Sequence, residues 1–172
     1  GAGGLGTTAI QIAKKTTGAR VIALDVDDRK LDVARKVGAD LGINIRGLAS
    51  REILSKVKEF NGNLPADARI DFVGTPTTSS LGFDLIGRGG RLIMVGLFGG
   101  EGKFSLPIFP LKSVEIAGNF TGTLQDLGEM VQLVSRRVIE PVVSETVPLE
   151  NANDVIQRLT TGKIQGRAVL IP

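Results

Sequence analysis

Short β-branched runs alternate with amphipathic segments over the first hundred residues, and this alternation constrains the fold more than any other feature. The runs predict buried parallel strands at 19–25, 39–45, 69–74 and 91–97. The segments between them predict helices at 27–37, 50–60 and 78–87. Such alternation is typical of an α/β protein with a doubly wound parallel sheet, both of whose faces are covered by helices. We expect that architecture here.

Beyond Gly99 the regular alternation of predicted strands and helices ends. A stretch with two prolines, 104–113, leads to a strand at 114–120 and a helix from Leu124 to about Arg136. The run VVSETVP at 142–148, a helix at 151–161 and a last strand at 166–172 close the chain.

The chain begins with the glycine-rich stretch GAGGLG, in which Gly1, Gly3 and Gly6 fit the pattern G-x-G-x-x-G. In dinucleotide-binding folds the first glycine allows a tight turn, the second lets the backbone approach a pyrophosphate, and the third lets helix and strand pack closely. Apolar residues at helical spacing follow at Leu5, Ala9 and Ile12. They predict a helix whose N-terminus offers free N–H groups to phosphates. Alone, the pattern also fits an ordinary glycine-rich loop.

Asp25 ends the predicted strand at 19–25, about 20 residues after the glycine pattern, where a carboxylate can accept both ribose hydroxyls of an adenosine. The same carboxylate repels the 2′-phosphate of NADP by about 4 kcal/mol at contact distance. The spacing therefore favours NAD. Lys30 fits either a solvated helix surface or a second contact to the same ribose, and Asp27 fits a helix N-cap rather than a catalytic acid.

The composition excludes several kinds of chemistry. The chain has no His, Cys or Tyr, so it lacks an imidazole base, a thiolate and the usual ligands of a zinc site. We expect neither a metal site nor a catalytic residue in it. The formal net charge is +3, but the basic residues are scattered among acids, so no nucleic-acid partner is expected. No apolar run is long enough to predict a membrane partner, and the absence of cysteine favours a cytoplasmic location.

Taken in order, GAGGLG, ARVIALDVDDRKLDVARKVGAD, IDFVG, GRGGRLIMVGL and GRAVLIP resemble the coenzyme-binding half of the medium-chain, zinc-dependent alcohol dehydrogenases. The resemblance covers nearly the whole chain. It implies a Rossmann fold, NAD as cofactor, and hydride transfer between an alcohol or carbonyl substrate and NAD. In the family the catalytic zinc is bound by an N-terminal substrate domain, so zinc is implied for the complete enzyme and not for this chain.

The resemblance also implies a cofactor-binding role for particular residues. The backbone at Gly4 and Leu5 meets the pyrophosphate, which Arg167 also reaches, while Asp25 and Lys30 hold the adenosine ribose. Three residues lie at the ends of predicted strands. Val73, at the end of the strand at 69–74, flanks the adenine side, and the backbone groups of Val95 and Leu97, at the end of the strand at 91–97, face the nicotinamide carboxamide.

In the family a strand precedes the glycine pattern, so the resemblance implies a fragment that lacks the first, central strand of its sheet. We expect an NAD-binding Rossmann domain at 1–121 and, at 122–172, a segment that packs on the absent substrate domain. The strand at 114–120 beside the proline-rich stretch fits the sheet edge that pairs across a dimer axis in the family, so a homo-oligomer, dimer or tetramer, is expected. The same edge also fits one that prolines protect from pairing.

Two other readings of the sequence stay open. A stand-alone nucleotide sensor without catalysis would share the glycines and Asp25, although it has no need of the runs at 91–97 and 166–172. A methyltransferase also has a glycine-rich cofactor loop and an acid after the second strand. The sequence does not show which alcohol is the substrate.

Overall fold

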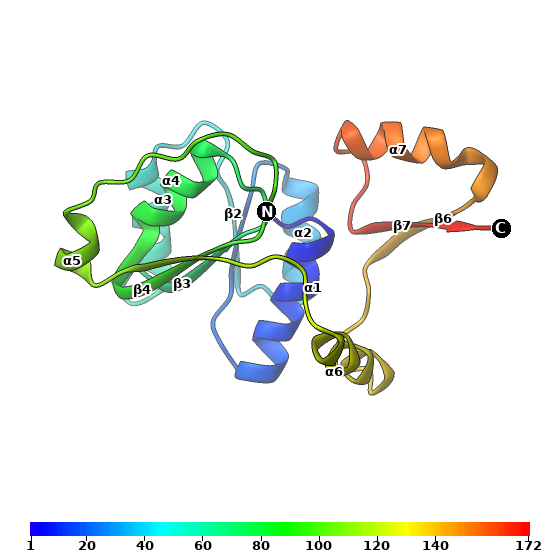
Figure 1. Ribbon diagram of the computed structural model, residues 1–172, viewed down its shortest axis with the longest axis horizontal. Helices are drawn as coiled ribbons and strands as arrows, with labels where there is room; N and C mark the ends of the chain where they lie inside the picture. Colours follow the sequence, from blue (N-terminus) through cyan, green and yellow to red (C-terminus); the bar gives the residue numbers. More distant parts are fainter. The chain divides into compact units, whose positions relative to one another are not determined.

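The computed structural model describes residues 1–172, in which helices and strands alternate along the chain (Figure 1). The helices are α1 (Gly4–Ile12), α2 (Asp28–Lys36), α3 (Ser50–Phe60), α4 (Pro76–Leu85), α5 (Ile108–Lys112), α6 (Leu124–Ser135) and α7 (Ala152–Thr160), with a π-helical turn η1 (Ala13–Thr17) and a 3-10 turn η2 (Leu149–Asn151). The strands are β1 (Ile22–Asp25), β2 (Leu41–Asn44), β3 (Ala66–Asp71), β4 (Ile86–Met94), β5 (Glu115–Gly118), β6 (Val143–Pro148) and β7 (Arg167–Ile171).

The chain divides into two compact units. Unit 1 consists of Gly1 and residues 45–121, and unit 2 consists of residues 2–44 and 122–172. All paired strands are parallel, in the orders β3-β4-β5 within unit 1 and β1-β2 and β6-β7 within unit 2. Parallel strands joined through helices confirm the predicted α/β class.

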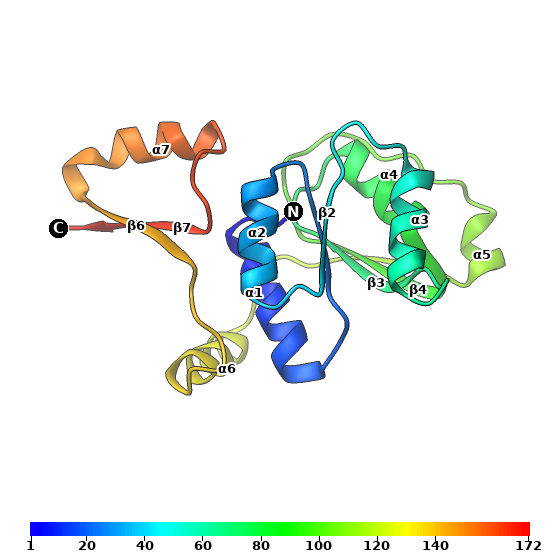
Figure 2. The ribbon, with the colours of Figure 1, turned by 180° about the vertical axis from the view of Figure 1, so that it is seen from behind.

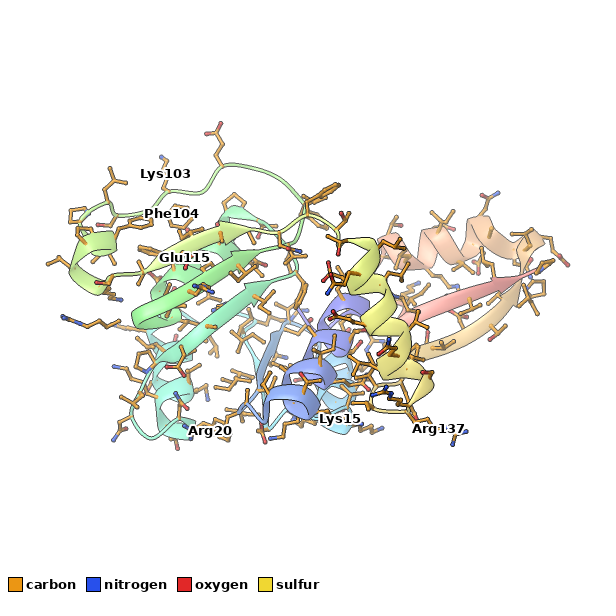
Figure 3. The ribbon with its side chains drawn as sticks, turned by 60° about the horizontal axis from the view of Figure 1, so that its bottom comes forward. Lys15, Arg20, Lys103, Phe104, Glu115 and Arg137 are labelled. Carbon is orange, nitrogen blue, oxygen red and sulfur yellow. The ribbon has the colours of Figure 1, made fainter.

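Unit 1 is built on the β3-β4-β5 sheet. Its buried centre contains Phe83, Ile86 and Leu92, and aromatic residues from the segment after β4 pack against it. The ring centroid of Phe104, which Figure 3 places on that segment, lies 5.2 Å from the ring centroid of Phe83. Tilted aromatic pairs at this distance add to the free energy gained by burial. The unpredicted helix α5 lies in this segment and begins after Pro107, a residue suited to the first turn of a helix.

Unit 2 contains the glycine-rich N-terminus and the C-terminal segment. Helix α2 packs on β1 and β2, and the core there is formed by small and branched apolar residues: Ala2, Ile10, Ala23, Leu31, Ala34 and Ala39. Helix α1 continues into η1, which ends at Gly18 with a φ of 68°. Strands β6 and β7 run side by side below α7 in Figure 1, and Figure 2 shows the same pair from behind.

Most predicted elements are confirmed, with shifted ends. The helices at 50–60 and from Leu124 are found as α3 and α6, and Asp27 caps α2 as expected, because its side chain accepts the N–H of Arg29. Strand β3 begins at Ala66, three residues before the predicted start. Strand β4 begins at Ile86, but residues 87–90 bulge out of the pairing with β3 before it resumes at Arg91. Gly89, at a φ of 70°, allows this bulge.

None of the helices is both long and apolar enough to cross a membrane.

Candidate coenzyme-binding site

The glycine-rich stretch forms the start of α1. Gly3 is the N-cap of this helix, and no side chain caps its first N–H groups. A Cβ atom on Gly3 would meet nothing within 4 Å, so the space before the helix is open on that side. Uncapped N–H groups at a helix N-terminus attract anions, because they are donors at the positive end of the helix dipole. Gly6 is buried in α1, whereas Leu5 is half exposed.

Arg167 lies directly against this helix start. A Cβ atom on Gly4 would sit 2.6 Å from the Cζ atom of Arg167, so only glycine leaves room for the guanidinium. Arg167 is the first residue of β7, and its side chain is exposed. The structure thus brings a cation and the N-terminus of α1 together, as binding of a pyrophosphate requires. This observation shows that the chain's own residues fit the diphosphate of a dinucleotide.

Asp25 ends β1 and faces the same turn. Its Oδ2 atom accepts the backbone N–H of Ala2 at 2.8 Å, and its Oδ1 atom accepts the N–H groups of Val26 and Asp27 at 2.8 and 3.1 Å. Three backbone donors hold the half-buried carboxylate in place. Each oxygen can accept a further hydrogen bond, because a carboxylate offers about four acceptor positions. A ribose diol is a suitable donor for them.

Asp27 and Lys30 lie beside this carboxylate in sequence. Asp27 accepts two hydrogen bonds from the Arg29 guanidinium, at 3.1 and 2.7 Å. That interaction, together with the N–H of Arg29 and the nearby charge of Lys30, lowers the pKa of Asp27 to about 2. Asp27 is therefore an ionised helix cap and not an acid-base catalyst near neutral pH. Lys30 lies half-buried in the first turn of α2 and makes no salt bridge with Asp25.

In unit 1, Asp71 forms hydrogen bonds to both segments that carry predicted site residues, the one with Val73 and the one with Val95. Its Oδ1 atom accepts the N–H groups of Val73 and Gly74 at 2.9 and 3.1 Å. Its backbone oxygen accepts the N–H groups of Val95 and Gly96, both at 2.9 Å. The carboxylate is 4% exposed, and its Oδ2 atom has no hydrogen-bond partner. Sequence reasoning missed Asp71, although an acid that ends a strand before a glycine turn is a recognisable signal.

The segments after β3 and β4 approach each other closely. A Cβ atom on Gly74 would overlap the backbone oxygen of Gly96, and one on Gly96 would overlap the backbone of Val73. Val73 also lies against Gly1, whose added Cβ would be 3.0 Å from its Cγ2 atom. Leu97 is 78% exposed. The structure therefore joins Val73 and Val95 within unit 1 and leaves Leu97 at the surface.

One cationic side chain in this unit is partly desolvated. Arg69 on β3 donates to the backbone oxygen of Leu81 at 3.2 Å. Burial lowers the pKa of Arg69 to about 10, although the carboxylates of Asp71 and Asp84 act in the opposite direction. The Arg69 guanidinium therefore stays protonated at neutral pH.

The residues of this chain do not provide a metal site. No group of three or more His, Cys, Asp or Glu side chains in residues 1–172 could hold a metal ion.

The sequence and structure of this chain are similar to those of known proteins. A NAD-dependent alcohol dehydrogenase of Sulfurisphaera tokodaii is 36% identical over 170 residues, which are 99% of this chain and 48% of that protein. A NAD-dependent alcohol dehydrogenase of Saccharolobus solfataricus is 33% identical over the same coverage. The crystal structure of the alcohol dehydrogenase from Aeropyrum pernix superimposes with a TM-score of 0.91 at 38% identity, and covers all of this chain and 48% of its own.

The chain spans about half the length of these relatives. The sequence pattern of one family, described as zinc-binding dehydrogenase, matches residues 4–136. This stretch includes Gly4, Leu5 and Gly6, Asp25 and the segments after β3 and β4, whereas Gly1, Gly3 and Arg167 lie outside it. The chain belongs to the zinc-binding dehydrogenase family.

Proposed function

We propose that this chain is the NAD-binding part of an oxidoreductase that transfers a hydride between an alcohol and NAD. One observation carries the proposal: the Asp25 carboxylate, the uncapped N-terminus of α1 and the Arg167 guanidinium all border the glycine turn. A diol acceptor next to an anion site matches the ribose and pyrophosphate of a dinucleotide. The NAD-dependent relatives, which match the chain along its whole length, support the same reading.

We assign each residue the role that the family resemblance implies. Gly1, Gly3 and Gly6 shape the turn, the N–H groups of Gly4 and Leu5 meet the pyrophosphate, and Asp25 binds the ribose with help from Lys30. Val73 flanks the adenine, and the backbone at Val95 and Leu97 holds the nicotinamide carboxamide. Bound NAD supplies the hydride acceptor, and these residues orient it. The catalytic zinc and the substrate pocket belong to other parts of the complete enzyme.

Titration of the full-length enzyme with NAD and NADP by calorimetry tests the proposal. We expect NAD to bind about 100-fold more tightly, because the charge of Asp25 opposes a 2′-phosphate. Equal affinities for the two coenzymes would refute the ribose assignment. Binding of neither coenzyme, with S-adenosylmethionine bound instead, would favour the methyltransferase alternative.

The division of the chain at residue 121 is part of the proposal. We place the NAD-binding domain at 1–121 and assign 122–172 to a segment that packs on a substrate domain. The exposed apolar face of α6 supports this assignment: Leu124 is 85% exposed, Leu127 59% and Val131 58%. Their spacing of three and four residues puts them on one side of the helix. A continuous apolar stripe of this kind normally packs against another element.

We further propose a cytoplasmic homo-oligomer, dimer or tetramer, that pairs through the edge of unit 1. Strand β5 is the last strand of the β3-β4-β5 sheet, and Phe120, two residues beyond it, is 77% exposed. A free edge next to exposed apolar side chains suits pairing with a second copy. Light scattering of the full-length protein tests this, and a monomeric mass would contradict it.

A further inference from the structure

We infer that Gln11 is a positioning residue for the pyrophosphate of NAD, because it fixes the segment that carries Arg167 to the glycine turn. The inference rests on the proposed function and adds a residue that makes no contact with the coenzyme itself. It is carried by a closed series of contacts within unit 2.

Gln11 lies in α1 and is 4% exposed. Its Nε2 atom donates to the backbone oxygen of Glu140 at 2.8 Å, and its Oε1 atom accepts the backbone N–H of Glu140 at 2.9 Å. The side-chain amide therefore satisfies both backbone groups of one residue, as a neighbouring strand would. A buried amide with both ends paired fixes its partner's position and is costly to leave unpaired.

The fixed segment leads directly to Arg167. Two residues after Glu140, the backbone oxygen of Val142 accepts the N–H of Arg167 at 2.8 Å. Val143 then pairs with Arg167 at the start of the β6-β7 ladder. Next to Glu140, Ile139 is 2% exposed, so the segment is also held by packing. The start of β7 thus takes its position from the segment that Gln11 holds.

The series closes at the first turn of α1, where the Arg167 guanidinium lies against Gly4. One helix therefore provides both the anion-binding N-terminus and, two turns later, the anchor for the arginine. Arg167 itself has an exposed side chain, and no hydrogen bond or salt bridge ties its guanidinium to a protein group. Its placement depends on the backbone to which it is attached. Loss of the Gln11 amide leaves the Glu140 backbone groups unpaired and loosens that backbone.

A double-mutant cycle separates this role from general stabilisation. In the full-length enzyme, Gln11→Met keeps the side-chain volume and removes both hydrogen bonds to Glu140 together with a longer one to the Thr7 backbone oxygen, and Arg167→Met removes the cation. We expect Gln11→Met to weaken the Kd for NAD about fivefold in the parent and less than about twofold in the Arg167→Met background. In an Asp25→Asn background the full fivefold effect should remain, because the ribose contact does not pass through Arg167.

The matched control is Asn61→Leu. Asn61 also bridges two backbone oxygens, those of Leu64 and Pro65, at 3.2 and 3.0 Å, but it lies in unit 1. This variant should lower the melting temperature without changing the Kd for NAD. If Gln11→Met fails to fold, Gln11→Leu, which also removes the side-chain amide and introduces no charge, takes its place in the same cycle.

The outcomes are distinct. A melting temperature lowered by Gln11→Met with an unchanged Kd overturns the inference, and so does equal weakening of the Kd with and without Arg167. Faster hydrogen exchange at the Glu140 and Arg167 amides in coenzyme-free Gln11→Met supports the mechanical link even if the parent binds no NAD, and unchanged exchange rejects it. Failure of the parent to bind NAD refutes the proposed function separately.

Discussion

The Oδ2 atom of Asp25 accepts the backbone N–H of Ala2 at 2.8 Å, which joins the end of β1 to the glycine turn. The two residues are 23 positions apart in sequence. Because the carboxylate is already held by three backbone N–H groups, it needs little reorganisation to accept two hydroxyls. The fold thus fixes the Asp25 carboxylate in advance for the ribose contact that we propose.

Asp25→Ser should change coenzyme preference. Removal of the carboxylate removes the repulsion of a 2′-phosphate and one acceptor for the ribose, so the ratio of NADP to NAD affinity should rise about 100-fold. Calorimetric titration with both coenzymes measures the ratio. Asp32→Ser is the matched control, because Asp32 lies on the exposed side of α2 and pairs with Arg35. An unchanged ratio in Asp25→Ser would show that the ribose is bound elsewhere.

Gly4→Ala should weaken NAD binding with little effect on folding. The new Cβ atom displaces the flexible end of Arg167, which can move into solvent, so stability should change by less than about 1 kcal/mol. The displaced guanidinium no longer borders the anion site, and the Kd for NAD should rise about fivefold. Gly128→Ala in α6, where an added Cβ meets nothing, is the control. It should leave the Kd unchanged.

Asp71→Ala should destabilise unit 1. The substitution removes the acceptor of the Val73 and Gly74 N–H groups and leaves both buried donors without it, at a cost of about 2 to 4 kcal/mol. Asp71→Asn keeps one oxygen and should cost less. Urea denaturation of the full-length enzyme measures the free energy of unfolding. Asp67→Ala, on the exposed start of the same strand, should change it by less than about 0.5 kcal/mol, and a similar loss there would contradict the assigned role.

The pKa of Asp27 gives a pH dependence with a definite sign. The hydrogen bonds from Arg29 lower this pKa from 3.8 to about 2 in the folded protein. The native state therefore holds the proton less tightly than the unfolded chain. The resulting stabilisation is fully present above the unfolded value near 3.8 and is lost as the pH falls through 2.

Carboxyl NMR titration checks this directly. In Arg29→Met the Asp27 pKa should rise toward 3.8, because the hydrogen bonds from the Arg29 side chain, the largest cause of its shift, are removed. Arg35→Met removes a similar arginine from the far end of α2 and should leave the Asp27 pKa near 2. An equal rise in both variants would assign the shift to net charge instead of the Arg29 hydrogen bonds.

Local patterns predicted most of the fold. Helix α3 was found where the apolar spacing placed it, because Ile53 and Val57 form one buried face. The Asp27 cap followed from residue type and position alone. The predicted role of Arg167 in pyrophosphate binding came from the family resemblance, because composition alone does not distinguish it from an ordinary surface arginine. Its contact with Gly4 depends on the path of the last two strands, which no local pattern specifies.

Features set by long-range contacts were not predictable in the same way. The Gln11 amide bonds to a residue 129 positions away, and glutamine in a helix gives no local signal for such a partner. The π-helical turn η1 lies within a stretch whose residues suit an ordinary helix. The sequence predicts the strand only from residue 91, and the register with β3 shows that strand pairing begins earlier, at Ile86, before the bulge at 87–90.

The apolar face of α6 leads to a last prediction, which tests whether residues 122–172 pack on a substrate domain. Leu127→Lys puts a charge on a side chain that is 59% exposed in this chain alone. If a further domain covers the face, the charge must be desolvated, and the full-length enzyme should lose about 2 to 3 kcal/mol of stability. Gln132→Lys, on an exposed polar position of the same helix, is the matched control and should be neutral. Equal melting temperatures for both variants and the parent would show that the face stays open to solvent and that the segment packs elsewhere.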